Sequence, residues 1–185
     1  PRLCSDVSLG MRVRASDFGR YLVAGVQGPH RCFWRDVGPI GSYCAASQAL
    51  VSLTAAFNLY TPQWPLISSG LHLPPVKFVF ADAESQRIGI ATDSMVSDDV
   101  IISGGTINRS ILSPRVRTHS YSEVEQSILM DSDEMGRPSK VRRCIIYTGD
   151  KPPPGSLIGS DQDADQEPVT VNDLGLGRDT KAKVH

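Results

Sequence analysis

The hydrophobic positions in the second half of the chain recur with a period of about 17 residues, and a fixed period of this length is the sequence signature of a repeat architecture. Three tripeptides show it best, because they recur at this step and each carries two aliphatic residues: Ser110-Ile111-Leu112, Ser127-Ile128-Leu129 and Cys144-Ile145-Ile146. Two further series keep the same step, namely Ile90, Ile107, Val124, Val141 and Ile158, and Ile101, Thr118, Met135 and Pro152.

The spacing within each repeat predicts short strands rather than a helix. Apolar residues recur at intervals of six, five and six, whereas an amphipathic α-helix would place them three and four residues apart. We therefore expect triangular coils with three short strands each, one inward aliphatic side chain per strand, and parallel hydrogen bonding between coils. About three coils are needed to bury a continuous core, and the repeat supplies roughly four. The pattern predicts a parallel β-helix over residues 78–159.

Residues 1–59 have a different pattern, which predicts a strand, a turn and a helix. Cys32-Phe33-Trp34 is an apolar stretch that predicts a strand, followed by the turn sequence Arg35-Asp36-Val37-Gly38. Ser42 can cap a helix whose apolar positions recur at intervals of three and four. These positions are Tyr43, Ala46 and Leu50.

Two segments do not predict regular structure. Residues 60–77 contain Pro62, Pro65, Pro74 and Pro75 and are interpreted as a proline-rich linker. The β-helix should end near the run Pro152-Pro153-Pro154, because proline cannot donate a hydrogen bond to the next strand. Beyond it, residues 160–185 form an acidic tail that we expect to be mobile.

Composition excludes several classes of function. The chain is 40% hydrophobic and 21% charged, with a net charge of −1 and a pI near 6.5, so no broad basic surface for nucleic acid is expected. No apolar run approaches the roughly 18 residues needed to cross a membrane, which makes a cytoplasmic location the default expectation. The four cysteines show no C-x-x-C spacing, which argues against a zinc knuckle or a redox pair.

Several ordered motifs resemble a known family. They include Trp34-Arg35-Asp36-Val37-Gly38 and Leu73-Pro74-Pro75-Val76-Lys77, and in the repeat region Ile102-Ser103-Gly104-Gly105-Thr106, Leu112-Ser113-Pro114-Arg115-Val116-Arg117 and His119-Ser120-Tyr121-Ser122-Glu123. From Ser16 to about Gly159 the chain resembles the ADP-glucose pyrophosphorylases, or glucose-1-phosphate adenylyltransferases, of bacterial glycogen synthesis. The match covers the carboxy-terminal portion of that family.

The resemblance implies both a fold and a reaction. It implies an α/β remnant of a Rossmann-like nucleotidyltransferase domain, then the linker, then a left-handed parallel β-helix that serves assembly and allosteric regulation. The handedness comes from the family alone. The implied reaction joins ATP and glucose 1-phosphate into ADP-glucose and pyrophosphate with the help of Mg²⁺, in an enzyme that is expected to be a homotetramer.

The resemblance also implies two site residues in the first region. Asp36 stands where the family has a ligand of the catalytic metal, and a carboxylate is a hard oxygen ligand that suits Mg²⁺. The pattern alone would favour a turn-capping role for Asp36 before the following helix, and the resemblance makes the metal role the preferred interpretation. Asp17 corresponds to a family element near the sugar-phosphate pocket and would bind substrate, although a turn or helix cap is an equal alternative. No catalytic residue is assigned in this part of the family sequence.

Four arginines of the repeat region are candidates for binding phosphorylated regulators, by resemblance. The planar guanidinium group suits phosphate. The alternative is that they are solvated residues at the corners of the coils, which is the usual place of such side chains. They are Arg115, Arg117, Arg142 and Arg143.

His119 allows a third interpretation, since hexapeptide-repeat acyltransferases combine a β-helix with a histidine base. That mechanism requires the histidine to lie in a groove between subunits. Because His119 falls inside a motif that resembles the adenylyltransferases, an exposed residue on a coil is the preferred interpretation.

The family's glycine-rich G-x-G-x-R-L loop, its second metal-binding aspartate and its sugar-phosphate lysine all precede Ser16 in the family order, and none occurs here. We therefore expect the chain to be inactive alone. The preferred hypothesis is the carboxy-terminal part of a glucose-1-phosphate adenylyltransferase. The alternative is a non-catalytic β-helix subunit for assembly or regulation.

Overall fold

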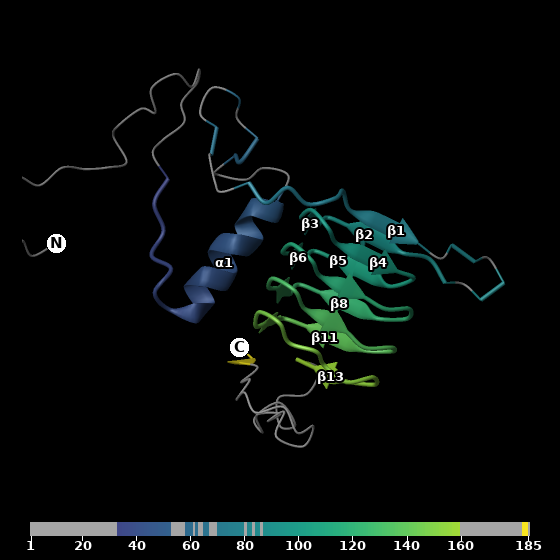
Figure 1. Ribbon diagram of the computed structural model, residues 1–185. Coiled ribbons are helices and arrows are strands. Elements are labelled where there is room, and N and C mark those ends of the chain that lie inside the picture. The colour runs from purple at the N-terminus through teal and green to yellow at the C-terminus, as the bar shows by residue number, and fades with distance from the viewer. Residues whose placement is uncertain are drawn as a thin grey trace, which may run out of the picture.

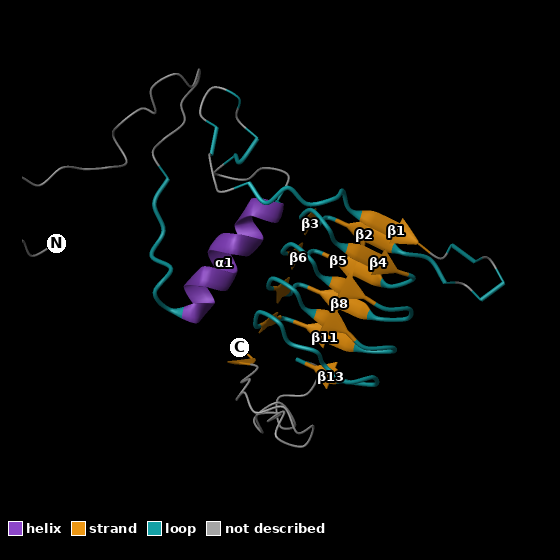
Figure 2. Ribbon diagram, viewed as in Figure 1, coloured by secondary structure: helices purple, strands orange, loops and turns teal. Residues whose placement is uncertain are grey.

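The computed structural model describes residues 33–52, 58–60, 62, 65–66, 70–79, 81–82, 84–85 and 87–159, together with the backbone of residues 183–184. Within this part of the chain, helix α1 (Ile40–Val51) precedes a stack of short strands. Figure 1 shows the strands stacked in rows beside α1, and Figure 2 shows that loops join them at the corners of each coil.

The strands form three sheets, each of which receives one strand from successive coils. The first sheet contains β1 (Lys77–Val79), β4 (Ile101–Ser103), β7 (Arg117–Thr118) and β10 (Glu134–Met135). The second contains β2 (Ile90–Thr92), β5 (Thr106–Asn108), β8 (Glu123–Glu125), β11 (Lys140–Arg142) and β13 (Leu157–Ile158). The third contains β3 (Met95–Val96), β6 (Ile111–Leu112), β9 (Ile128–Leu129), β12 (Cys144–Ile146) and β14 (Lys183–Val184).

Pairing between coils confirms the predicted parallel β-helix. Ile107 pairs with Val124, and Val124 pairs with Val141, so both pairings follow the predicted repeat. Ile111 and Ile128 are related by the same step in the third sheet. All of these pairings are parallel, and the repeat forms about four coils, as expected.

One predicted inward position is wrong by a single residue. Ile102 pairs with Thr118, one residue short of the repeat, and Ile102 is fully buried, whereas the predicted inward residue Ile101 is only partly buried. The cause lies in the corner between β4 and β5. Gly104 has a φ of +68°, a conformation that glycine adopts without strain, and with Gly105 it makes this corner one residue shorter than its equivalent in the next coil.

The same short corner shifts the start of the second sheet. Ala91, not Ile90, pairs with Ile107 and packs against the core. Ile90 is 40% exposed, so its predicted place in the inward series is also corrected.

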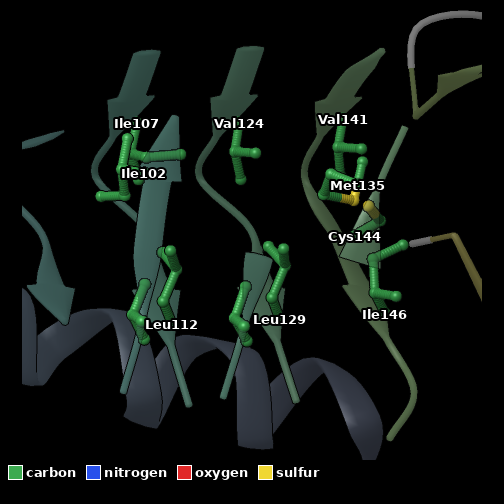
Figure 3. Packing of buried hydrophobic residues seen from close by; sticks show 11 residues of the cluster. Ile102, Ile107, Leu112, Val124, Leu129, Met135, Val141, Cys144 and Ile146 are labelled. Carbon is green, nitrogen blue, oxygen red and sulfur yellow. The ribbon is translucent and has the colours of Figure 1, made fainter. Parts of the chain in front are cut away.

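The inward side chains stack in columns, as Figure 3 shows for the central coils. Most members are aliphatic and fully or almost fully buried, and each contributes about 1.5–3 kcal/mol to the stability of the fold. The columns are Ile107, Val124 and Val141; Leu112, Leu129 and Ile146; and Ile102, Thr118 and Met135. Thr118 interrupts its column, as predicted, and its hydroxyl group has no hydrogen-bond partner among the described residues.

The corners turn through residues in the left-handed backbone conformation. At the corner between the second and third sheets, this residue recurs from coil to coil with a φ between +45° and +48°. Non-glycine residues rarely adopt such angles, so the recurring geometry is imposed by the coil. The residues are Asp93, Arg109, Gln126 and Arg143.

Helix α1 covers the outer face of the third sheet. The predicted helix is confirmed, but it begins at Ile40, with Pro39 before it, so Ser42 lies inside the helix and not at its cap. Outward positions on the third sheet are apolar, and α1 lies against β6 (Figure 1). On the same sheet, Ile128 and Ile145 are only 3% and 9% exposed, although alternation along the strand turns them away from the core.

Phe33 and Trp34, the described part of the predicted strand Cys32-Phe33-Trp34, do not form a strand. A strand is stable only with neighbours to pair with, and no described strand lies beside this segment. Of the predicted tail, two residues lie within the described part and form β14, which pairs antiparallel with β12. No helix among the described residues is long and apolar enough to cross a membrane.

Candidate functional site

Asp36, the predicted metal ligand, lies in the exposed turn that leads into α1. Its Oδ1 accepts a hydrogen bond from the backbone N–H of Gly38 at 2.9 Å. The turn-capping role that the pattern allowed is thus present, and it uses one of the two carboxylate oxygens. An ionised carboxylate has further acceptor capacity on its second oxygen, so a turn-capping Asp36 can also reach a cation.

The described residues do not form a metal site by themselves. No group of three or more His, Cys, Asp or Glu among them is arranged to hold a metal ion. Mg²⁺ is commonly bound through one or two carboxylates and completed by water and substrate phosphate oxygens, so a single aspartate fits such a site as one of its ligands. Asp17, the predicted substrate-binding residue, lies outside the described residues.

Two of the predicted regulator-binding arginines make ion pairs with aspartates of neighbouring coils. Arg115 lies 3.1 Å from Oδ2 of Asp131. Arg117 lies 3.2 Å from Oδ1 of Asp99 and also donates to the Asp99 carbonyl oxygen. Both pairs are partly exposed, where an ion pair contributes only about 0–1 kcal/mol to stability.

The other two arginines lie on a different side of the coil. Arg142 points outward from β11 and lies 3.3 Å from Oε2 of Glu125. Arg143 follows it at the corner between the second and third sheets and is exposed, with no ion pair to a described residue. Because Arg115 and Arg117 belong to another corner and another sheet, the structure does not bring the four arginines into one pocket.

His119 belongs to a surface network on the first sheet. Its Nε2 lies 3.1 Å from Oε1 of Glu134, and Nζ of Lys151 lies 3.0 Å from the second oxygen of the same carboxylate. The hydrogen bond from His119, followed by that from Lys151, lowers the pKa of Glu134. His119 is 45% exposed, which agrees with the preferred interpretation of an exposed coil residue.

Asp133 is a buried acid that the sequence interpretation missed. It is fully buried, and its Oδ1 accepts a hydrogen bond from the backbone N–H of Asp150 at 3.1 Å. Burial raises the pKa of Asp133 to about 8. The signal was present in the sequence, because Asp133 stands one repeat after Val116, a core residue.

Comparison with known proteins agrees with this fold. The family described as "GlmU-like, C-terminal hexapeptide" matches residues 74–177. A glucose-1-phosphate adenylyltransferase of Anaeromyxobacter sp. is 41% identical over 165 residues, which are 89% of this chain and 40% of the relative. Its counterpart in Deinococcus deserti is 40% identical over 177 residues, which are 95% of this chain and 41% of the relative.

A third adenylyltransferase of the same name, from Frankia casuarinae, is 42% identical over 161 residues. These cover 86% of this chain and 39% of the relative, so the chain spans about 40% of the length of the curated relatives it matches. The matched part is their carboxy-terminal hexapeptide portion, which confirms the resemblance noted in the motifs. The chain therefore belongs to the GlmU-like C-terminal hexapeptide family and is homologous to the carboxy-terminal portion of glucose-1-phosphate adenylyltransferases.

Proposed function

We propose that this chain is the carboxy-terminal part of an enzyme that joins ATP and glucose 1-phosphate into ADP-glucose and pyrophosphate. The observation that carries the proposal is the match to proteins named glucose-1-phosphate adenylyltransferase over 86–95% of this chain. The match includes the segment with Asp36 and α1 as well as the β-helix, because it extends well before residue 74, where the hexapeptide family begins.

In this proposal, Asp36 holds Mg²⁺ with the carboxylate oxygen that Gly38 does not use. The bound Mg²⁺ would neutralise negative charge on the reacting phosphates. The turn restrains the side chain, since the Gly38 N–H fixes the orientation of the carboxylate. A Cβ at position 38 would lie 3.2 Å from Oδ1 of Asp36, so glycine leaves the carboxylate the room it occupies.

The test measures ADP-glucose formation by the complete gene product with Asp36→Asn. Asparagine can still accept the Gly38 hydrogen bond but has lost the negative charge. We expect turnover to fall at least about 100-fold and the Mg²⁺ concentration for half-maximal activity to rise, as loss of positioning and charge neutralisation would cause.

Asp93→Asn is the matched control, because Asp93 is an exposed aspartate on a β-helix corner and asparagine tolerates its φ of +45°. It should leave turnover and Mg²⁺ dependence unchanged. If Asp36→Asn also left both unchanged, Asp36 would be a turn residue and not a metal ligand.

The second candidate is a non-catalytic β-helix subunit that serves assembly or regulation. The observation that favours it is that the regular structure in the described residues consists of the β-helix and α1. Absence of ADP-glucose formation by the complete gene product under all substrate and Mg²⁺ concentrations would favour this candidate over the enzyme.

A further inference from the structure

Asp133 occupies a core position that aliphatic residues occupy in the coils above it. The carbonyl groups of Val100, Val116 and Asp133 accept hydrogen bonds from the first residues of β1, β4 and β7, respectively, so the three residues are structurally equivalent. All three are fully buried. The next equivalent residue is Asp150, whose carbonyl group accepts a hydrogen bond from Glu134 at the start of β10.

The polar atoms of Asp133 are incompletely satisfied. Oδ1 accepts the N–H of Asp150 at 3.1 Å, whereas the buried Oδ2 has no hydrogen-bond partner among the described residues. An ionised carboxylate in such a place is disfavoured, because burial removes its hydration and Oδ2 gains no hydrogen bond in return. A protonated carboxyl group is far easier to accommodate there.

No described basic side chain makes an ion pair with Asp133. The acid Asp150 lies next to it in the stack, and the charge of that carboxylate further raises the pKa of Asp133. Backbone groups of Asp150, Met130 and Gly149 oppose this effect, but burial remains the largest influence.

The cations beside the equivalent positions 116 and 150 are paired elsewhere. Each makes its ion pair on the outside of the β-helix, with an acid other than Asp133. The pairs are Arg115 with Asp131, Arg117 with Asp99, and Lys151 with Glu134.

We propose that Asp133 is a pH-dependent switch that controls the carboxy-terminal coils of the β-helix. When protonated, Asp133 packs between Val116 and Asp150 and holds the turn that begins the last coil. When the proton leaves, the carboxylate requires water, and the corner formed by residues 147–150 must open to admit it. The last coil, through residue 159, then separates more readily from the coil above it.

The direction of the effect on stability follows from the two states. The pKa of Asp133 is about 8 in the fold, whereas an aspartate in an unfolded chain ionises near pH 4. The stabilisation of the fold by protonated Asp133 is fully present below about pH 4 and is lost as the pH rises toward 8. Between these limits, each unit of pH favours the unfolded chain about tenfold, because only the unfolded chain has released the proton.

The test compares the whole chain with its Asp133→Asn variant by urea unfolding at pH 5, 6 and 7. Asparagine keeps the acceptor for the Asp150 N–H and cannot ionise. We expect the unfolding constant of the parent, divided by that of the variant, to rise about tenfold per pH unit. Asp133→Val, which restores the residue type of positions 100 and 116, should give the same pH dependence of the ratio.

Asp131→Asn is the matched control, since Asp131 lies two residues away but its side chain is 38% exposed and paired with Arg115. The unfolding constant of the parent, divided by that of Asp131→Asn, should not rise with pH. A ratio for Asp133→Asn that is independent of pH would overturn the proposal, and so would an equal rise for Asp131→Asn. Failure of both Asp133 variants to fold would also overturn it, because neutral residues at this position should favour folding.

Cys144 provides a local measurement of the opening. It lies in β12, at the edge of the coil that should open, and is 3% exposed. Labelling of its thiol should be faster in the parent than in Asp133→Asn, by a factor that grows from pH 6 to 8; comparison at each pH cancels the intrinsic reactivity of the thiol. Equal labelling rates at every pH would show that Asp133 does not control this coil.

Discussion

At the corner between the second and third sheets, serine side chains form hydrogen bonds with backbone groups of the next coil. The hydroxyl of Ser110 accepts the N–H of Ser127 at 3.1 Å and donates to the Asn108 carbonyl at 2.7 Å. One coil later, the hydroxyl of Ser127 accepts the N–H of Cys144 at 3.3 Å. Both serines are fully buried, so each hydroxyl satisfies a backbone group that water cannot reach.

Ser127→Ala should therefore destabilise the chain by about 1–3 kcal/mol, because the buried hydrogen bond from the Cys144 N–H to the Ser127 hydroxyl would be lost. Urea denaturation at fixed pH measures this loss. Ser156→Ala is the control, since the Ser156 hydroxyl donates to the Pro153 carbonyl and lies at the surface. A cost for Ser127→Ala no greater than that for Ser156→Ala would show that the serine column does not hold the coils together.

The sequence allowed most inward residues to be predicted, since Ile107 and its successors follow the regular step of the repeat. It failed at Ile101, because a single shorter corner changes the register and periodicity alone does not reveal where a glycine pair removes a residue. Asp133 was missed for a related reason. Its burial depends on its place in the stack, and an isolated aspartate in a polar turn sequence resembles any solvated corner residue.

At the scale of elements, α1 and the third sheet depend on each other. The outward residues of the third sheet are aliphatic, in contrast to the second sheet, where Glu123 pairs with Lys140 and Glu125 with Arg142 on the outer face. The helix has no residue that is fully buried, so its stability comes from lying against this apolar face. The helix could be predicted from its own residues, but the face it covers could not be, because outward and inward aliphatic residues look alike in such short strands.

Ile128→Ala should test this packing. Ile128 is 3% exposed on the side of the third sheet that α1 covers, so the truncation should cost about 2–5 kcal/mol in the free energy of unfolding. Leu157→Ala is a suitable control because Leu157, on β13, is 65% exposed, and its loss should change stability by no more than about 0.5 kcal/mol. Similar effects of the two changes in urea denaturation would mean that α1 does not bury this face in solution.

At the scale of the whole molecule, the three-sided cross-section decides which arginines can act together. Arg115 and Arg117 flank the corner that leads into the first sheet, whereas Arg142 and Arg143 flank the corner that leads out of the second. The resemblance could supply the four candidates but not this separation, because it arises from the way the chain folds around the core. Ion pairs with Asp131, Asp99 and Glu125 also engage three of the four guanidinium groups.

We propose that a phosphorylated regulator of the complete enzyme would bind at Arg143 in preference to Arg115. Arg143 has no competing carboxylate among the described residues, whereas a phosphate at Arg115 must displace Asp131. The probe is inorganic phosphate, and the measurement is its effect on ADP-glucose formation. Arg143→Gln should raise the phosphate concentration for half-maximal effect about tenfold, as expected for the loss of one charge-assisted hydrogen bond. Arg115→Gln should raise it by less than about twofold, because in this proposal the phosphate does not bind at Arg115, which pairs with Asp131. Equal shifts for the two variants, or a phosphate response that neither changes, would place the regulator elsewhere and leave all four arginines as surface residues of the coils.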